Sequence, residues 1–157
     1  MKYLYFNNKI KNYYIKKRER WLISHWKTFK NDVLTNSREE ILRKALAEMG
    51  VELDTSIKSI TNPWGHEKVD MGFKKDGKEI ALGFKEETNA DGSKTLVLKG
   101  DFYSTGLVEA EFMDKVSQCY TKNDIIDKIE NRTSYTIEGT PTVNENGEIE
   151  IIAYTFA

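Results

Sequence analysis

Residues 69–103, VDMGFKKDGKEIALGFKEETNADGSKTLVLKGDFY, decide the fold that the sequence predicts. In the first two segments of this stretch every second residue is apolar, at Val69, Met71 and Phe73 and then at Ile80, Leu82 and Phe84. A period of two is typical of β-strands with one apolar face. Asp76-Gly77 lies between the segments, and glycine tolerates the positive φ of a tight turn. We therefore expect a β-hairpin here.

A third strand is expected after a longer turn over residues 89–92, which contains two Asx residues and a glycine. Its apolar positions are Leu96 and Leu98, with Phe102 at its far end. Three consecutive antiparallel strands form a meander with one apolar face. Helices must cover that face to keep it from water.

The segment before the meander predicts a strand, a helix and a second, short strand. We expect the first strand over residues 23–32 and the short one over residues 51–56. Ser37 and Glu40 have the spacing of a capping box, in which each side chain bonds the other residue's backbone amide. Apolar residues follow at helical spacing, and Gly50 stands where a left-handed C-terminal cap belongs.

The segment after the meander predicts two helices and a hairpin. The first helix carries an apolar stripe at four-residue steps: Val108, Phe112, Val116 and Tyr120. Thr121 or Asn123 is expected to cap a third, shorter helix, which carries Ile125, Ile126 and Ile129. The chain then forms strands over residues 135–142 and 149–156, joined by a turn at Asn146-Gly147.

Taken together, these elements predict a single α+β domain over residues 23–157. We expect an antiparallel or mixed sheet with two to three helices on one face. Because both ends of the chain contain strands and helices in alternation, a ferredoxin-like or related sandwich is the expected architecture. A chain of 157 residues is long enough for one adequate core and short for two.

The composition is that of a globular protein outside the membrane. Charged residues make up 31% of the chain, and no apolar run approaches the roughly 20 residues that cross a bilayer. The N-terminus has no secretory signal pattern. Cys119 is the single cysteine, which excludes an internal disulfide. We therefore expect a cytoplasmic protein.

Residues 1–22 differ from the rest, because they hold seven basic residues against Glu19 alone. The codons of Lys-Lys-Arg-Glu-Arg can resemble a ribosome-binding site. This favours the interpretation that translation begins at Leu22 or Ile23 and that the residues before it do not belong to the natural protein. A second interpretation is an additional helix, packed or flexible. A third is a basic arm whose aromatic residues stack on single-stranded nucleic acid. The remaining residues carry about seven negative charges in excess, a poor match for duplex nucleic acid.

Several short segments resemble an uncharacterised family, the domain of unknown function 1257, which includes a hypothetical reading frame of plastid and cyanobacterial genomes. The matching segments, in order, are Ser24-His25-Trp26, Ala45-Leu46-Ala47-Glu48-Met49-Gly50, Val69-Asp70, the Gly-Phe-Lys-Lys-Asp-Gly stretch, Asp101-Phe102-Tyr103 and Gln118-Cys119-Tyr120. The chain departs from the family pattern at Cys119, where arginine is expected. The resemblance implies an accessory role, in which an AAA-type ATPase is the partner, and it implies no active site.

The sequence offers few groups for chemistry. His25, His66 and Cys119 are the only soft or borderline metal ligands, and they lack the spacing of a metal site. Cys119 lies beside a helical apolar stripe, where a thiol usually serves packing. We therefore expect no catalytic residues, no metal and no cofactor.

The candidate binding residues are His25, Trp64, His66, Asp101 and Tyr103. Pro63 and Gly65 predict a loop over residues 61–65, and loops on rigid scaffolds concentrate binding residues. Trp64 has two interpretations, a contact surface or a lid over the edge of the meander. Asp101 and Tyr103 are expected at the same end of the sheet.

These observations favour a small non-enzymatic accessory or interaction protein. The first alternative is a domain that binds a nucleotide or another small molecule between the helices and the loop at Trp64 and His66. The second is nucleic-acid binding by the basic N-terminal arm.

Overall fold

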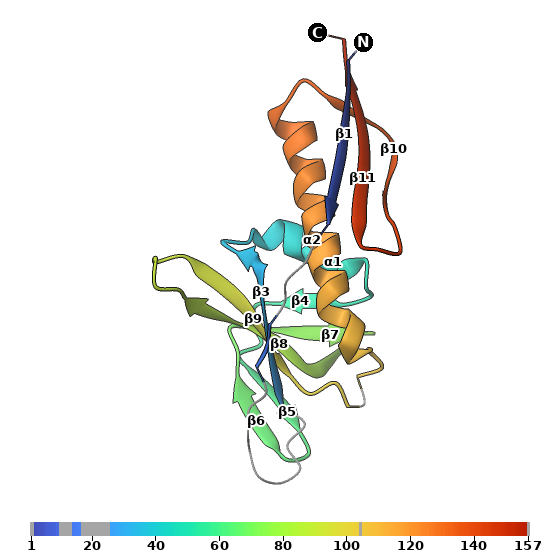
Figure 1. Ribbon diagram of the computed structural model, residues 1–157. Helices are drawn as coiled ribbons and strands as arrows, with labels where there is room; N and C mark the ends of the chain where they lie inside the picture. Colours follow the sequence, from blue (N-terminus) through green and yellow to red (C-terminus); the bar gives the residue numbers. More distant parts are fainter. Residues whose placement is uncertain (1, 10–13, 17–25, 104, 157) are drawn as a thin grey trace.

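The predicted meander lies at the centre of a six-stranded sheet. The computed structural model describes residues 2–9, 14–16, 26–103 and 105–156 (Figure 1). The strands of this main sheet, in the order β2-β3-β9-β8-β7-β4, are β2 (Tyr14–Lys16), β3 (Lys27–Thr35), β9 (Lys94–Gly100), β8 (Lys78–Thr88), β7 (Met71–Lys75) and β4 (Glu52–Asp54). Neighbouring strands pair antiparallel throughout. The predicted turn is confirmed, with positive φ angles at Asp76 and Gly77.

Two helices cover one face of the main sheet, α1 (Glu39–Ala47) and α2 (Glu109–Arg132). Large side chains from the sheet and both helices form the main core, among them Phe73, Phe84, Leu98, Leu42, Leu46 and Phe112. These side chains are almost fully buried, which confirms the apolar face that the meander predicted. The α+β class and a pair of helices on one face are likewise confirmed.

The N-terminal cap of α1 differs from the prediction. Arg38 occupies the cap position and makes no side-chain cap hydrogen bond, so the capping box of Ser37 and Glu40 is wrong. The Arg38 amide instead donates to the Tyr120 hydroxyl of α2 at 2.9 Å, a tertiary contact that the local spacing does not reveal. The C-terminal cap is confirmed, because Gly50 has a φ of +72°.

Helix α2 replaces the two helices that the sequence predicted. No glycine or proline interrupts Glu109–Arg132, so the backbone continues past the expected caps at Thr121 and Asn123. The apolar stripe moves to another side of α2 along its length, because the two halves of the helix pack against different parts of the protein. Phe112, Val116 and Tyr120 belong to the main core, whereas Ile129 packs in a second cluster.

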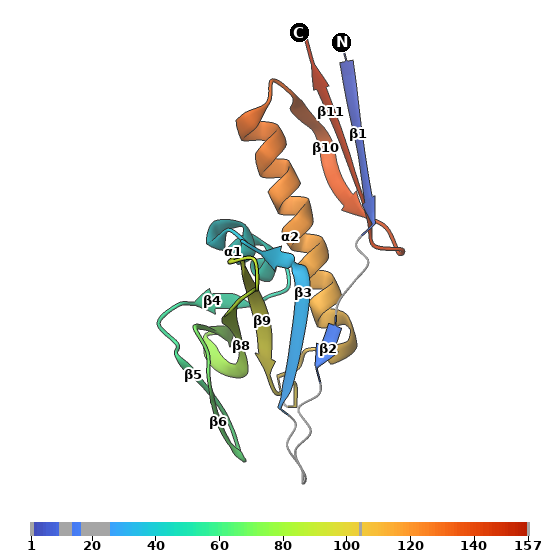
Figure 2. The ribbon, with the colours of Figure 1, turned by 60° about the vertical axis from the view of Figure 1, so that its left-hand side comes forward.

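The second cluster lies under a three-stranded sheet at the far end of α2 (Figure 2). Its strands, in the order β1-β11-β10, are β1 (Lys2–Lys9), β11 (Glu148–Thr155) and β10 (Thr136–Val143). The predicted C-terminal hairpin is therefore confirmed. Residues 2–9 and 14–16 are strands, so the interpretation of residues 1–22 as an additional helix is wrong for these two segments. The predicted first strand is β3, and residues 23–25 lie outside the described residues.

A hairpin of β5 (Ser59–Asn62) and β6 (Gly65–Lys68) lies where the sequence predicted a loop. It belongs to the face of the main sheet opposite the helices. Gly72 and Gly83 pair across β7 and β8, and neither position has room for a Cβ. A Cβ at Gly72 would lie 2.3 Å from Ile57, which precedes the hairpin. A Cβ at Gly83 would lie 2.6 Å from the Met71 carbonyl oxygen and 3.1 Å from Val69, which follows the hairpin. Pro63 and Trp64 form the turn of the hairpin, so the turn signals were correct but the flanking strands were missed.

The strand order also differs from a ferredoxin-like sandwich. That fold has two β-α-β units whose strands run parallel. Here α1 connects β3 to β4, which run in the same direction but are separated by three strands, β9, β8 and β7, rather than by one. Helix α2 leads out of the main sheet to β10 of the small one, so it completes no such unit.

Arg38 ties the start of α1 to the middle of α2. Its guanidinium lies 2.6 Å from Asp124 Oδ1 and 2.7 Å from Asp127 Oδ2. The hydrogen bond from Arg38 lowers the pKa of Asp127. Burial alone would raise the pKa of Asp124, but hydrogen bonds from Lys128 and Arg38 outweigh it and lower that pKa as well. Both carboxylates thus stabilise the folded state only while they are ionised.

We predict that the double variant Asp124→Asn/Asp127→Asn is less stable than the unmodified protein at pH 7 and less sensitive to acid. Because the folded-state pKa values are lowered, the contribution of these carboxylates is present above their unfolded pKa of about 3.9 and is lost as the pH falls through the folded values. Urea unfolding at pH 7, 5 and 3, followed by circular dichroism, measures this. The control replaces the exposed Glu138 and Glu145 by glutamine. Identical pH dependence of both double variants would contradict the assignment.

Candidate functional site

Two exposed aromatic side chains meet at one end of the main sheet. Among the described residues, four large apolar side chains are exposed: Trp64, Tyr103, Val108 and Phe156. Trp64 lies at the turn of the β5–β6 hairpin, and Tyr103 and Val108 lie in the segment that connects β9 to α2. The rings of Trp64 and Tyr103, which we call the aromatic pair, contact each other with centroids 6.5 Å apart. Trp64 is 49% exposed, which overturns its interpretation as a lid over the core.

A network of three hydrogen bonds fixes the backbone beneath the aromatic pair. Asn62 Oδ1 accepts from the Trp64 amide at 2.9 Å, and Asp101 Oδ1 accepts from the Tyr103 amide at 2.9 Å. Each is an Asx turn that orients the residue two positions on. Asn62 Nδ2 donates to Asp101 Oδ2 at 2.8 Å and joins the two turns. Asp101 is 1% exposed and Asn62 is half-buried, so the bond between the two layers is partly shielded from water.

Asp101 reaches this position because of Gly100 and an irregularity in β8. The pairing of β7 with β8 shifts register so that Ala81 and Leu82 have no partner residues on β7. The Ala81 carbonyl accepts a hydrogen bond from the Asp101 amide at 2.8 Å. A Cβ at residue 100 would lie 2.0 Å from that carbonyl oxygen, so the close approach requires glycine. Bulges often redirect side chains beside functional sites in this way.

The structure brings together three of the five candidate residues. Trp64, Asp101 and Tyr103 lie at one end of the sheet, as expected. His66 is exposed on β6 opposite Thr61 and takes no part in the network. His25 lies outside the described residues. Sequence reasoning missed Asn62, although an asparagine two residues before Trp64 is the signal of an Asx turn.

A cavity of about 160 Å³ lies beside the aromatic pair. Its walls come from the β5–β6 turn, from the start of β8 and from the segment after β9. Tyr103 lines it from one side and Glu79 belongs to its β8 wall. The cavity is therefore continuous with the surface that carries the exposed rings.

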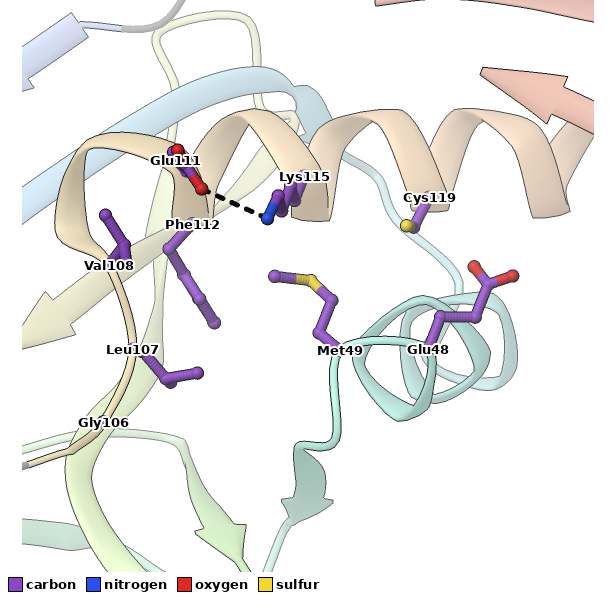
Figure 3. Close-up of a pocket in the computed structure, with 9 residues that line it drawn as sticks. All are labelled: Glu48, Met49, Gly106, Leu107, Val108, Glu111, Phe112, Lys115 and Cys119. Carbon is purple, nitrogen blue, oxygen red and sulfur yellow. Dashed lines mark ion pairs between the residues drawn. The ribbon is translucent and has the colours of Figure 1, made fainter. Parts of the chain in front are cut away.

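A larger cavity, of about 430 Å³, lies between the end of α1 and the start of α2 (Figure 3). Met49, Leu107 and Phe112 line it with apolar atoms. Its charged groups already have partners, because Glu111 pairs with Lys115 at 3.2 Å and Glu48 pairs with Lys122 at 2.5 Å. Nothing in this lining is poised to bind the phosphates of a nucleotide.

Cys119 lines the same cavity and lies beside the Glu48 carboxylate (Figure 3). Burial, the negative charge of Glu48 and a hydrogen bond to Glu48 raise the pKa of the Cys119 thiol to about 11. A nucleophilic cysteine requires the opposite shift, since the thiolate is the reactive form. Within the described part of the chain, no cluster of three or more histidine, cysteine or acidic residues has the arrangement of a metal site.

We predict that Gly100→Ala destabilises the fold by about 3 kcal/mol, because the new Cβ meets the Ala81 carbonyl and the φ of +148° suits glycine alone. Gly92→Ala is the matched control. Gly92 also has a positive φ, but no atom lies near its missing Cβ, so a loss of about 1 kcal/mol is expected there. Urea unfolding measures both. Equal losses would show that the contact with Ala81 is unimportant.

We predict that Cys119 reacts with iodoacetamide at pH 8 about a hundredfold more slowly than an unperturbed thiol, because its raised pKa leaves little thiolate. Glu48→Gln removes the neighbouring charge and should accelerate alkylation several-fold. Glu111→Gln, in the same cavity, should not. Mass spectrometry of timed samples gives the rates. Rapid alkylation of the unmodified protein would refute the assigned protonation state.

Comparison of the chain with protein-family models, with curated proteins and with solved structures gave no match. Among the helices described, none has the length and apolar character needed to cross a membrane. The functional interpretation therefore depends on the geometry of the aromatic pair and its surroundings.

Proposed function

We propose that this chain is a cytoplasmic, non-enzymatic accessory protein that binds another protein through the aromatic pair. The observation that carries this proposal is the contact between two exposed aromatic rings. Trp64 is 49% exposed and Tyr103 is 66% exposed, and their ring centroids lie 6.5 Å apart. Tryptophan and tyrosine are enriched at protein interfaces and among the residues that dominate binding energy.

The hydrogen bonds of Asn62 and Asp101 support the proposal further. An exposed aromatic side chain loses conformational freedom when a partner covers it, and that loss weakens binding. Here the backbone of Trp64 and Tyr103 is held by Asx turns before any partner arrives. The two rings already contact each other. The loss of conformational entropy when a partner binds is therefore smaller.

The charge near the aromatic pair favours a protein partner over nucleic acid. Aromatic pairs also stack on single-stranded bases, but such sites combine the rings with a basic groove that follows the phosphates. The cavity beside Tyr103 has Glu79 in its wall instead. Residues 23–157 also carry a net negative charge. The resemblance to the domain of unknown function 1257 family adds an AAA-type ATPase as the partner to examine first.

Photo-cross-linking in cells that express the chain naturally tests this function. We predict that p-benzoylphenylalanine at position 103 forms one protein adduct of defined mass. Trp64→Ala in the same chain should reduce the yield about tenfold, as expected for an interface hot spot. The control carries the photoreactive residue at position 91, in the exposed β8–β9 turn.

Equal adduct yields at positions 103 and 91, or no adduct at 103, would contradict the proposed function. An adduct with RNA at position 103 would favour the nucleic-acid alternative. An adduct with an AAA-type ATPase that depends on Trp64 would support the partner that the resemblance implies.

A further inference from the structure

We propose that the cavity beside the aromatic pair receives a cationic side chain, arginine or lysine, of the protein partner. This inference rests on the proposed function and specifies the chemistry of its contact. The cavity is formed by three separate parts of the chain: residues 61–63, residues 79–81, and Tyr103 with Thr105. The hydrogen bond from Asn62 Nδ2 to Asp101 Oδ2 joins the first part to the third. The hydrogen bond from the Asp101 amide to the Ala81 carbonyl joins the third part to the second.

The size of the cavity suits one side chain. Pockets for drug-sized ligands and cofactors span about 300–1,000 Å³. At about 160 Å³ this cavity is too small for a nucleotide, yet a guanidinium or ammonium group with part of its aliphatic stem can enter. A side chain that projects from a protein surface meets this requirement.

The cavity wall holds a carboxylate that is available to a cation. Glu79 is exposed and lies opposite Lys74 in the β7–β8 ladder. The Lys74 ammonium instead forms an ion pair with Asp54, at 3.0 Å from Oδ2. Glu79 therefore makes no ion pair with any residue that the structure describes. An incoming arginine or lysine can pair with it without displacing an internal partner.

Tyr103 supplies the second attraction. A cation over the face of a tyrosine ring is stabilised by the ring quadrupole, by about 0.5–1 kcal/mol at exposed sites. The Asx turn of Asp101 fixes the backbone from which this ring projects. Arginine fits best, because its planar guanidinium stacks on an aromatic ring while it donates to a carboxylate.

Neighbouring charges are compatible with a cation at this position. The ammonium of Lys75 lies beside the cavity, because it donates to the carbonyl of Thr105, a residue of the cavity wall, at 3.2 Å. It lies next to Gly106 and is not part of the cavity wall. A divalent metal ion would find a single carboxylate here, too few charged ligands for tight binding. A phosphate would meet the charge of Glu79 and no basic wall.

Titration of the ¹⁵N-labelled full chain with N-acetylarginine N-methylamide tests the inference by NMR. We expect saturable shifts, with a millimolar dissociation constant, at the amides of residues 61–62, 79–81 and 103–105. The citrulline analogue has the same shape without the charge and should produce no saturable shift at these amides. The lysine analogue should bind more weakly than arginine but at the same amides.

Two variants make the test specific. Glu79→Gln and Tyr103→Ala should each weaken binding of the arginine amide about threefold or more. Glu130→Gln changes the net charge equally at an exposed position on α2 and should leave binding unchanged. The dispersion of the spectra shows that each variant is folded. Absence of shifts at these amides, equal binding of citrulline, or equal effects of Glu79→Gln and Glu130→Gln would overturn the inference.

The outcomes separate this inference from the proposed function. A Trp64-dependent protein adduct without arginine binding would leave the function standing and remove the cationic contact. Arginine binding without any protein adduct would establish the cation site and contradict the proposed function.

Discussion

The hydrogen bond between Asn62 Nδ2 and Asp101 Oδ2 is the interaction on which the end of the molecule with the aromatic pair depends. It joins the β5–β6 hairpin to the end of β9. The two layers also meet through the apolar cluster of Ile60, Val69 and Trp26 and through the ion pair of Lys99 with Glu67 at 3.8 Å. Asp101 is 1% exposed, so loss of Asn62 would be costly because the carboxylate would stay desolvated without this partner. The same two side chains also form the Asx turns under the aromatic pair. Asn62 and Asp101 therefore both attach the hairpin and orient the two rings.

Helix α2 has a comparable role for the whole chain. Its first half packs on the main core, and its second half supports the small sheet of β1, β10 and β11. Arg38 fixes the point between these halves through Asp124 and Asp127. The two sheets therefore meet through one continuous helix. Tyr103 of the aromatic pair precedes the first residue of that helix, Glu109, by six residues along the chain.

The sequence predicted features that depend on local spacing. The alternation of β7 and β8, the turn at Asp76-Gly77 and the cap at Gly50 follow from neighbours within a few residues. The continuity of α2 was missed because its apolar stripe moves to another side of the helix where the helix passes from the main core to the second cluster. In the sequence, such a break in the apolar spacing looks the same as the end of a helix. Asn62 and Asp101 are 39 residues apart, so no local pattern could reveal their hydrogen bond.

The exposure of Trp64 and Tyr103 is best explained by the structural features that hold the backbone beneath them. Scattered exposed apolar residues are common and require no explanation. Here three features position the two exposed rings. They are Gly100, which the close backbone approach requires, the register shift in β8, and the buried carboxylate of Asp101. None of these features enlarges the main core. The rings lie beside Glu79, which makes no ion pair with any described residue. This arrangement is the reason that we propose a partner with both apolar and cationic groups.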